Sequence, residues 1–149
     1  MNTKNSVIIV ASGNATRMQN VTQNCYPKIL TNVGQETVLD KILNTVAIST
    51  DIHLILASEL QVKQVQQYLK VVYDSHFDDI ITFHVTENSL SSSDSIRRHL
   101  EKLPNAALIM WSDIWLSENI VEMPVENTIF CDNNSRHRYK FNAKLNSIS

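Results

Sequence analysis

A continuous apolar run at residues 7–11 constrains the fold of this chain more than any other feature of the sequence. The run, VIIVA, is rich in β-branched side chains and does not alternate with polar residues. Such a run is typical of a strand that is buried on both faces of a parallel sheet. Further strand-like runs occupy residues 52–57, 80–85, 106–111, 128–131 and 137–141. The last two predict a short antiparallel hairpin near the C-terminus, with its turn at Asn133 and Asn134.

Segments with apolar residues at helical spacing lie between the first four runs. Residues 37–46, 59–72 and 93–103 have this spacing and are predicted to be amphipathic helices. Their expected inward positions are Val38, Leu39, Ile42, Leu43 and Val46, then Leu60, Val62, Val65, Leu69 and Val72, and finally Ile96, Leu100 and Leu103. Ser93 or Asp94 is expected to cap the third helix. The alternation predicts a three-layer α/β/α fold with a mostly parallel central sheet, whose ligands bind at the carboxyl ends of the strands.

The composition fits one globular domain over residues 1–149. Hydrophobic residues make up 43% and charged residues 19%, which is enough apolar surface for a core. The formal net charge is -2, so the chain lacks the basic surface expected of a non-specific nucleic-acid or membrane-surface binder. The polar start lacks the shape of a signal peptide, and no apolar stretch approaches the roughly 20 residues of a membrane span. We therefore expect a cytoplasmic protein without nucleic-acid or membrane partners.

The loop after the first run has the composition of a phosphate-binding loop. Residues 10–18 read VASGNATRM, and Lys28 and Gly34 follow downstream in YPKIL and VG. Small residues after a strand allow backbone N–H groups to face a triphosphate. Arg17 offers a planar guanidinium to phosphate oxygens, and Lys28 offers a compact ammonium.

This order of residues resembles the signature of the nucleotidyltransferase superfamily that makes sugar nucleotides and CDP-alcohols. The matching positions are Gly13, Thr16, Arg17, Pro27, Lys28 and Gly34. The resemblance implies a Rossmann-like nucleotidyltransferase fold, with Arg17 and Lys28 as catalytic residues that stabilise charge as pyrophosphate leaves. It also implies that the loop binds nucleotide through Ala11, Ser12, Gly13, Asn14, Ala15 and Thr16. Ser12 and Ala15 depart from the family pattern, in which alanine and glycine stand at these positions.

A second candidate site follows the fourth run, LIMW, where Ser112 and Asp113 stand. The family has a glycine and a metal-binding aspartate at this place, so the resemblance implies that Asp113 holds Mg²⁺. A carboxylate at the end of a strand suits this ion, which shares oxygen ligands with phosphates. The alternative is an aspartate that only caps a helix or lies in a loop.

A serine-containing segment at Ser93, Asp94 and Ser95 is similar to the stretch that lines the base and ribose in cytidylyltransferases, including the choline-phosphate type. The similarity implies nucleotide binding by these residues and favours CTP. A helix cap explains the same residues equally well. The five histidines show no metal-ligand spacing and are expected to be ordinary core or surface residues.

Two functions fit these observations. The first is a nucleotidyltransferase, or its nucleotide-binding part, that transfers a nucleotidyl group from a triphosphate to a phosphorylated sugar or alcohol. The second is a non-catalytic nucleotide-binding or interaction domain with the same fold. Arg17, Lys28 and Asp113 favour the first, whereas the change at Ala15 favours the second. Family members are much longer than this chain, so we expect an additional domain or a homo-oligomer around it.

Overall fold

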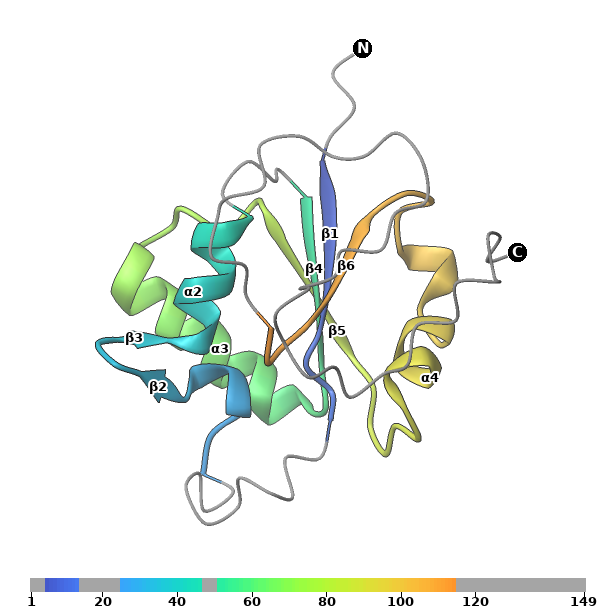
Figure 1. Cartoon of the computed structure of the whole chain (residues 1–149), viewed down its shortest axis with the longest axis horizontal. Helices are drawn as coiled ribbons and strands as arrows, with labels where there is room; N and C mark the ends of the chain where they lie inside the picture. Colours follow the sequence, from blue (N-terminus) through green and yellow to red (C-terminus); the bar gives the residue numbers. More distant parts are fainter. Residues whose placement is uncertain (1–4, 14–24, 47–50, 115–149) are drawn as a thin grey trace, which may run out of the picture.

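A sheet of four parallel strands is the centre of the computed structural model, which describes residues 5–13, 25–46 and 51–114 (Figure 1). The strand order is β5-β4-β1-β6. The four strands are β1 (Ser6–Val10), β4 (Asp51–Leu56), β5 (Ile81–Val85) and β6 (Leu108–Trp111). The predicted α/β class and the parallel sheet are therefore confirmed. The strands predicted at residues 128–131 and 137–141, with their hairpin, lie outside the described residues.

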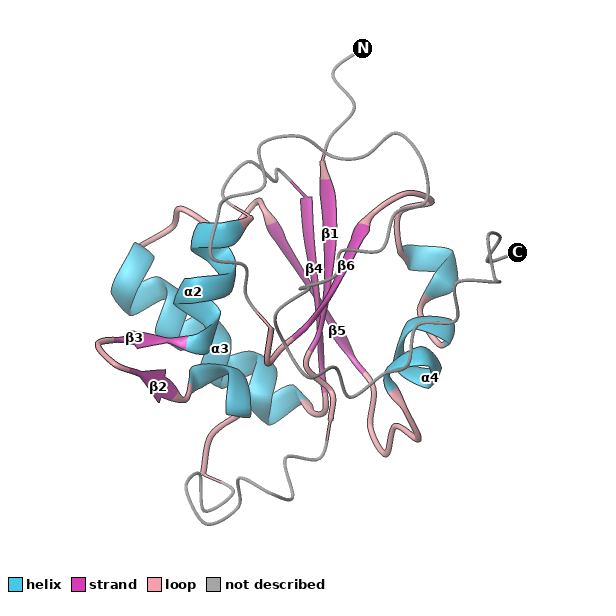
Figure 2. Cartoon of the chain, in the orientation of Figure 1, coloured by secondary structure: helices cyan, strands magenta, loops and turns pink. Residues whose placement is uncertain are grey.

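Helices cover both faces of this sheet (Figure 2). On one side lie α2 (Val38–Thr45) and α3 (Glu59–Tyr73), and on the other lie α4 (Ser92–Arg97) and the 3₁₀ turn η3 (Leu100–Lys102). The predicted three-layer arrangement is thus observed. None of the helices in the described part of the chain has the length and apolar character needed to cross a membrane.

Both faces of β1 are buried, which explains why its sequence is apolar throughout. Val7 and Ile9 pack into the larger core, under α2 and α3. Ile8 and Val10 pack into a smaller core with Ile55, on the face that α4 and η3 cover. Alternate side chains of a strand point to opposite faces, so a five-residue run supplies both cores.

Two short strands that the sequence patterns did not predict form a hairpin before α2. They are β2 (Asn32–Val33) and β3 (Glu36–Thr37), which pair antiparallel. Gly34 begins the two-residue turn with a φ of 74°, in the left-handed region that glycine adopts without strain.

The α2 helix is held at its start and against α3 by one carboxylate. Thr37 caps the helix: its hydroxyl accepts from the amide of Asp40, and the Asp40 carboxylate accepts from the amide of Thr37. The hydroxyls of Tyr68 and Tyr73 also donate to this carboxylate, each across 2.6 Å. Burial raises the pKa of Asp40, but the hydrogen bonds from Tyr68, Tyr73 and Thr37 together lower it below its ordinary value.

The helix predicted at residues 93–103 is wrong in its bounds and its cap. The structure has the six-residue α4 and the separate turn η3, and the capping side chain is Ser91, whose hydroxyl accepts from the amide of Asp94. His99 interrupts the helix with φ -118° and ψ 9°, and Nε2 of its ring lies 2.8 Å from the hydroxyl of Thr86. Leu100 was expected to point inward but is 61% exposed.

Three other expected core positions are also exposed. In α3, Leu60 is 64% exposed because it lies roughly 200° around the helix from Val62, which packs into the core. Val72 is in the last turn of this helix and is 50% exposed, whereas Tyr73 packs against the core there. In β6, Trp111 is 44% exposed, so this strand is less buried than its apolar sequence predicted.

Candidate functional site

The loops that follow β1 and β6 leave the sheet next to each other at the carboxyl ends of the strands. The amide of Ser112 donates to the carbonyl of Val10 across 3.1 Å, which continues the pairing of the two strands to their ends. Residues 11–13 therefore start beside residues 112–113. This edge of a parallel sheet is where ligands bind in such folds.

Lys28 reaches the same edge from a turn whose backbone is fixed by buried neighbours. It is the first residue of the 3₁₀ turn η2 (Lys28–Leu30). Pro27 is buried and has a φ of -67°, which its ring imposes. Ile29 is 1% exposed and belongs to the larger core. The two residues on either side thus hold the main chain in place while the Lys28 ammonium extends outward.

The ammonium of Lys28 lies 3.0 Å from a carboxylate oxygen of Asp113. The two residues are 85 positions apart in the sequence, and their side chains are 30% and 56% exposed. An exposed ion pair contributes only about 0–1 kcal/mol to stability, so this pair adds little to the stability of the fold. The structure thus brings together two of the three charged groups that the sequence singled out. Their roles in binding stay predictions.

The rest of the first loop is only partly described. Arg17, Asn14, Ala15 and Thr16 lie outside the described residues. Ala11 is half-buried, and Ser12 is 2% exposed.

Gly13 is exposed, and its φ lies outside the left-handed region. In the described part of the chain, no atom lies within 4 Å of the place where a Cβ would stand. Neither backbone strain nor internal packing among these residues therefore requires glycine at position 13. Glycine at position 13 would allow an external group to approach the backbone closely.

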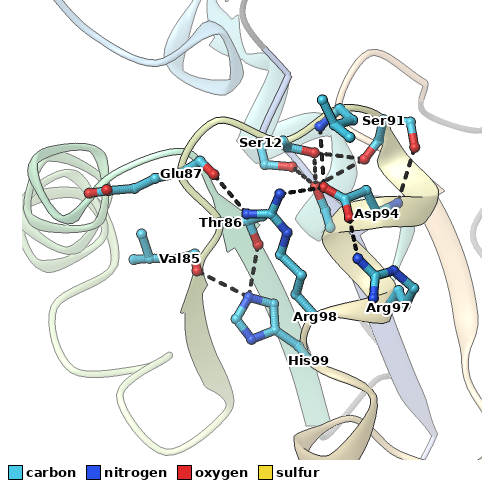
Figure 3. Close-up of polar contacts among 12 residues, drawn as sticks. Ser12, Val85, Thr86, Glu87, Ser91, Asp94, Arg97, Arg98 and His99 are labelled. Carbon is cyan, nitrogen blue, oxygen red and sulfur yellow. Dashed lines mark hydrogen bonds and ion pairs between the residues drawn. The ribbon is translucent and has the colours of Figure 1, made fainter.

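A cluster of serine hydroxyls, buried at Ser12 and Ser95, joins the first loop to α4 and the segment before it. The hydroxyl oxygen of Ser95 lies 2.5 Å from that of Ser12 and 2.6 Å from that of Ser89. The Ser89 hydroxyl donates to the carbonyl of Ser91 across 2.7 Å. Figure 3 shows Ser12 and Ser91 converging on this cluster from different elements. The two segments predicted to bind nucleotide are therefore in direct contact.

The Asp94 carboxylate holds the β5–α4 loop in place (Figure 3). It accepts hydrogen bonds from Arg97 and Arg98 at 2.9 and 2.7 Å and from the amide of Leu90 at 3.2 Å. These bonds lower the pKa of Asp94 to about 2. Arg98 also donates to the carbonyl of Glu87, so one guanidinium connects both ends of the loop. Ser93 is exposed on α4, and its predicted contact with nucleotide, like that of Asp94, stays a prediction.

Three histidines that are far apart in the sequence lie together on the α4 side of the sheet. His53 and His84 are buried and hydrogen-bonded to each other, with Nδ1 and Nε2 at 2.9 Å. The His84 and His99 rings are 5.0 Å apart, and Nε2 of His99 lies 2.8 Å from the hydroxyl of Thr86. The expectation of ordinary core histidines holds for His53 and His84. Their clustering depends on strand register, which residue spacing alone does not show.

The histidine cluster predicts a loss of stability in mild acid. Burial, together with the nearby charges of His53, His99 and Lys102, lowers the pKa of His84 from 6.5 to about 4. The folded state then binds fewer protons than the unfolded state between these values, so stability falls as the pH drops from 6.5 toward 4. We expect a loss of up to about 3 kcal/mol in urea denaturation. His84→Gln should flatten this dependence. The same change at the exposed His76 should leave the slope as in the wild type, and equal slopes in all three proteins would contradict the prediction.

Comparison with known proteins supports the fold. No family model matches the chain, and no curated protein matches it in sequence. A solved structure that is similar belongs to a protein from Bacillus anthracis assigned as a glucose-1-phosphate thymidylyltransferase, in complex with sucrose. The two chains are 21% identical and superpose with a TM-score of 0.58, over 72% of this chain and 44% of the other.

The likeness shows that this chain has the Rossmann-like α/β fold of a nucleotidyltransferase. At 21% identity it extends to the fold and not to the activity. The chain also matches less than half the length of the similar protein. The chemistry of the residues at the site is therefore the basis for inferring its ligand.

Proposed function

We propose that this chain binds a nucleoside triphosphate at the carboxyl ends of β1 and β6, as the nucleotide-binding part of a nucleotidyltransferase. The observation that carries the proposal is the 3.0 Å pair between Lys28 and Asp113. The pair consists of an ammonium, which is able to bind phosphate, and a carboxylate, which is suited to Mg²⁺, and it lies at the edge where ligands bind in such folds. Gly13 is exposed and no described residue packs where its side chain would stand, which supports the same location.

The proposed reaction is transfer of a nucleotidyl group to a phosphorylated sugar or alcohol. A phosphate oxygen of the acceptor attacks the α-phosphorus, the bond from this phosphorus to the bridging oxygen breaks, and pyrophosphate leaves with the electron pair. Arg17 and Lys28 supply positive charge to the leaving group. Such a reaction depends mainly on positioning and electrostatic stabilisation, which these two side chains provide without covalent chemistry.

The chemistry of Asp113 fits a divalent cation. Its carboxylate is 56% exposed and presents oxygen, the ligand that Mg²⁺ prefers. Magnesium commonly binds through one or two carboxylates, water and the phosphates of the substrate, so a complete protein cage is not required. When bound, the ion would neutralise charge on the phosphates. Asp113 would hold it, while Lys28 remains available to the triphosphate.

The nucleotide is best identified by a screen. The likeness of residues 93–95 to cytidylyltransferases favours CTP, and the structural likeness to a thymidylyltransferase adds dTTP to the candidates. Thermal unfolding with Mg²⁺ and each of ATP, CTP, GTP, UTP and dTTP should show one nucleotide that raises the melting temperature most. A ligand at 100 times its Kd stabilises the folded state by about 2.7 kcal/mol. No shift with any of the five nucleotides at millimolar concentration would refute the proposal.

Asp113→Asn should remove most of the Mg²⁺ dependence of nucleotide binding. For the wild type, we expect Mg²⁺ to increase the affinity for triphosphate at least about fivefold, the lower range of coupling between two ligands. The variant should bind triphosphate without Mg²⁺ at least as well as the wild type, because Lys28 loses its competing carboxylate. Isothermal titration with and without Mg²⁺ measures both effects. Asp79→Asn, an exposed change outside the proposed site, should keep the wild-type dependence. An unchanged dependence in Asp113→Asn would exclude this residue as the metal ligand.

The alternative function is a nucleotide-binding domain without turnover. It is favoured by Ala15, which stands where the family pattern has a glycine. A pyrophosphate-release assay with Mg²⁺, the nucleotide found in the screen and a panel of sugar 1-phosphates and phosphocholine discriminates the two functions. Release that depends on acceptor supports the transferase, and binding without release supports the alternative.

A further inference from the structure

The serine cluster has fewer hydroxyl protons than contacts at hydrogen-bond distance. Three hydroxyls, those of Ser12, Ser89 and Ser95, supply three protons, and the carbonyl of Ser91 supplies none. Four contacts connect these groups: three of 2.5, 2.6 and 2.7 Å, and a longer one of 3.2 Å between Ser95 and the carbonyl of Ser91. At least one contact therefore lacks a proton of its own.

Only one arrangement gives each of the three short contacts a proton. The Ser91 carbonyl can only accept, so Ser89 donates to it across 2.7 Å. Ser89 has no second proton, so Ser95 donates to Ser89 across 2.6 Å. Ser95 has then used its proton, and the 2.5 Å contact must be a donation from Ser12 to Ser95. The hydrogen bonds run in one direction, from the first loop into the β5–α4 loop.

This direction determines what Ser12 can offer to a ligand. Its only hydroxyl proton points toward Ser95, and its side chain is buried with the rest of the residue at 2% exposure. An anion beside Gly13 can then accept from backbone N–H groups but not from the Ser12 hydroxyl. Ser95 is 0% exposed, so it lies behind the loop rather than beside a ligand.

We propose that Ser95 is a positioning residue for the triphosphate site: by accepting the Ser12 proton, it anchors Ser12 and Gly13, the described start of the first loop, at the carboxyl end of β1 where the phosphates would bind. This inference rests on the proposed function. It gives Ser95 a role in phosphate binding without contact to the nucleotide, in contrast to the base or ribose contact implied by resemblance. The receiving loop is itself fixed by Asp94 and Arg98, so the anchor joins the first loop to a rigid neighbour.

Ser95→Ala tests this role when two probes are compared. Titrations use the nucleotide found in the screen and inorganic tripolyphosphate, which has no base or ribose. If Ser95 positions the phosphate loop, its loss weakens binding of both probes by the same factor, about three- to tenfold, the size expected for one lost hydrogen bond. If Ser95 contacts the base or ribose instead, only the nucleotide loses affinity, and the inference is overturned.

Two further variants separate positioning from folding. Ser6→Ala is the matched control, because Ser6 is likewise a buried serine whose hydroxyl donates to a partner on another element, the Asp51 carboxylate. Ser6 begins β1, at the end of the strand opposite the proposed site. Its melting temperature should fall while both affinities stay at wild-type values. In a Ser12→Ala background, Ser95→Ala should have no additional effect on either probe, since the contact is already lost. An additive effect would contradict the proposal.

The outcomes for the two proposals are distinguishable. A wild type that binds neither probe overturns the proposed function and this inference together. A wild type that binds both, with Ser95→Ala unchanged toward tripolyphosphate, overturns the inference alone. Should Ser95→Ala fail to fold, Ser95→Cys keeps a polar side chain there but offers the Ser12 proton a weaker acceptor, and the same equal loss for both probes is expected.

Discussion

Replacing Lys28 with alanine should weaken triphosphate binding about 10- to 100-fold. The estimate follows from the loss of hydrogen bonds between charged groups, each about 1.5–3 kcal/mol. Lys28 is suited to this contact because buried neighbours fix its backbone, and its ammonium carries three protons, of which the bond to Asp113 uses one. Isothermal titration with nucleotide and Mg²⁺ measures the change. The effect should diminish at high salt, as expected for exposed charges.

Lys41→Ala is the matched control for this experiment. Lys41 also pairs with a carboxylate, that of Glu36 at 3.3 Å, but it lies on α2 rather than at the carboxyl ends of the strands. Its replacement should leave nucleotide affinity unchanged. Equal affinities in Lys28→Ala and Lys41→Ala would exclude Lys28 from the binding site.

Asp40→Ala should lower the free energy of unfolding by about 2–4 kcal/mol. The change leaves the hydroxyls of Tyr68 and Tyr73 without their shared acceptor and removes half of the capping box with Thr37. A lost cap costs about 0.5–2 kcal/mol, and each buried donor without a partner costs about 1–3 kcal/mol. The low end applies to the two tyrosines, because both are only half-buried. Urea denaturation should show a lower midpoint with the slope unchanged, since the folded state exposes no additional surface.

Variants that lack one tyrosine hydroxyl are the comparison for Asp40→Ala. In Tyr68→Phe or Tyr73→Phe the carboxylate keeps its other donors, so each should cost less than half of the loss in Asp40→Ala. Nucleotide affinity should stay at the wild-type value in all three folded variants, because the cluster connects α2 to α3 and does not reach Lys28 or Asp113. A cost for either tyrosine as large as that for Asp40 would show that the carboxylate is not the centre of the cluster.

The sequence was sufficient to predict the sheet because parallel strands have a simple pattern. The run at residues 7–11 is apolar throughout, and β1 is buried on both faces. The helical spacing at residues 37–46 was equally informative, since α2 buries Val38, Leu39 and Ile42 as expected. The third helix was predicted poorly because His99 leaves the helical conformation to reach Thr86, a contact that periodicity does not encode.

The location of the candidate site was predictable from the sequence, because it lies at the carboxyl ends of predicted parallel strands. Lys28 and Asp113 were singled out by the resemblance to the family signature and by the chemistry of their side chains, and the structure places them 3.0 Å apart. Their roles in binding stay predictions. The serine cluster was not predictable in the same way. Ser95 was predicted to belong to a nucleotide-binding segment or a helix cap, and Ser89 was not singled out. The contact of Ser95 with Ser12 depends on how the β5–α4 loop lies against the end of β1, which the sequence pattern does not show.

The pair between Lys28 and Asp113 has a thermodynamic consequence for any anion that binds here. The ammonium is already neutralised, so an incoming phosphate exchanges one negative partner for another instead of meeting an unscreened charge. A cation that takes over the carboxylate removes the competitor and thereby raises the affinity for the anion, and the anion raises the affinity for the cation by the same factor. The pair thus makes loading of the two ligands a cooperative exchange rather than two independent steps.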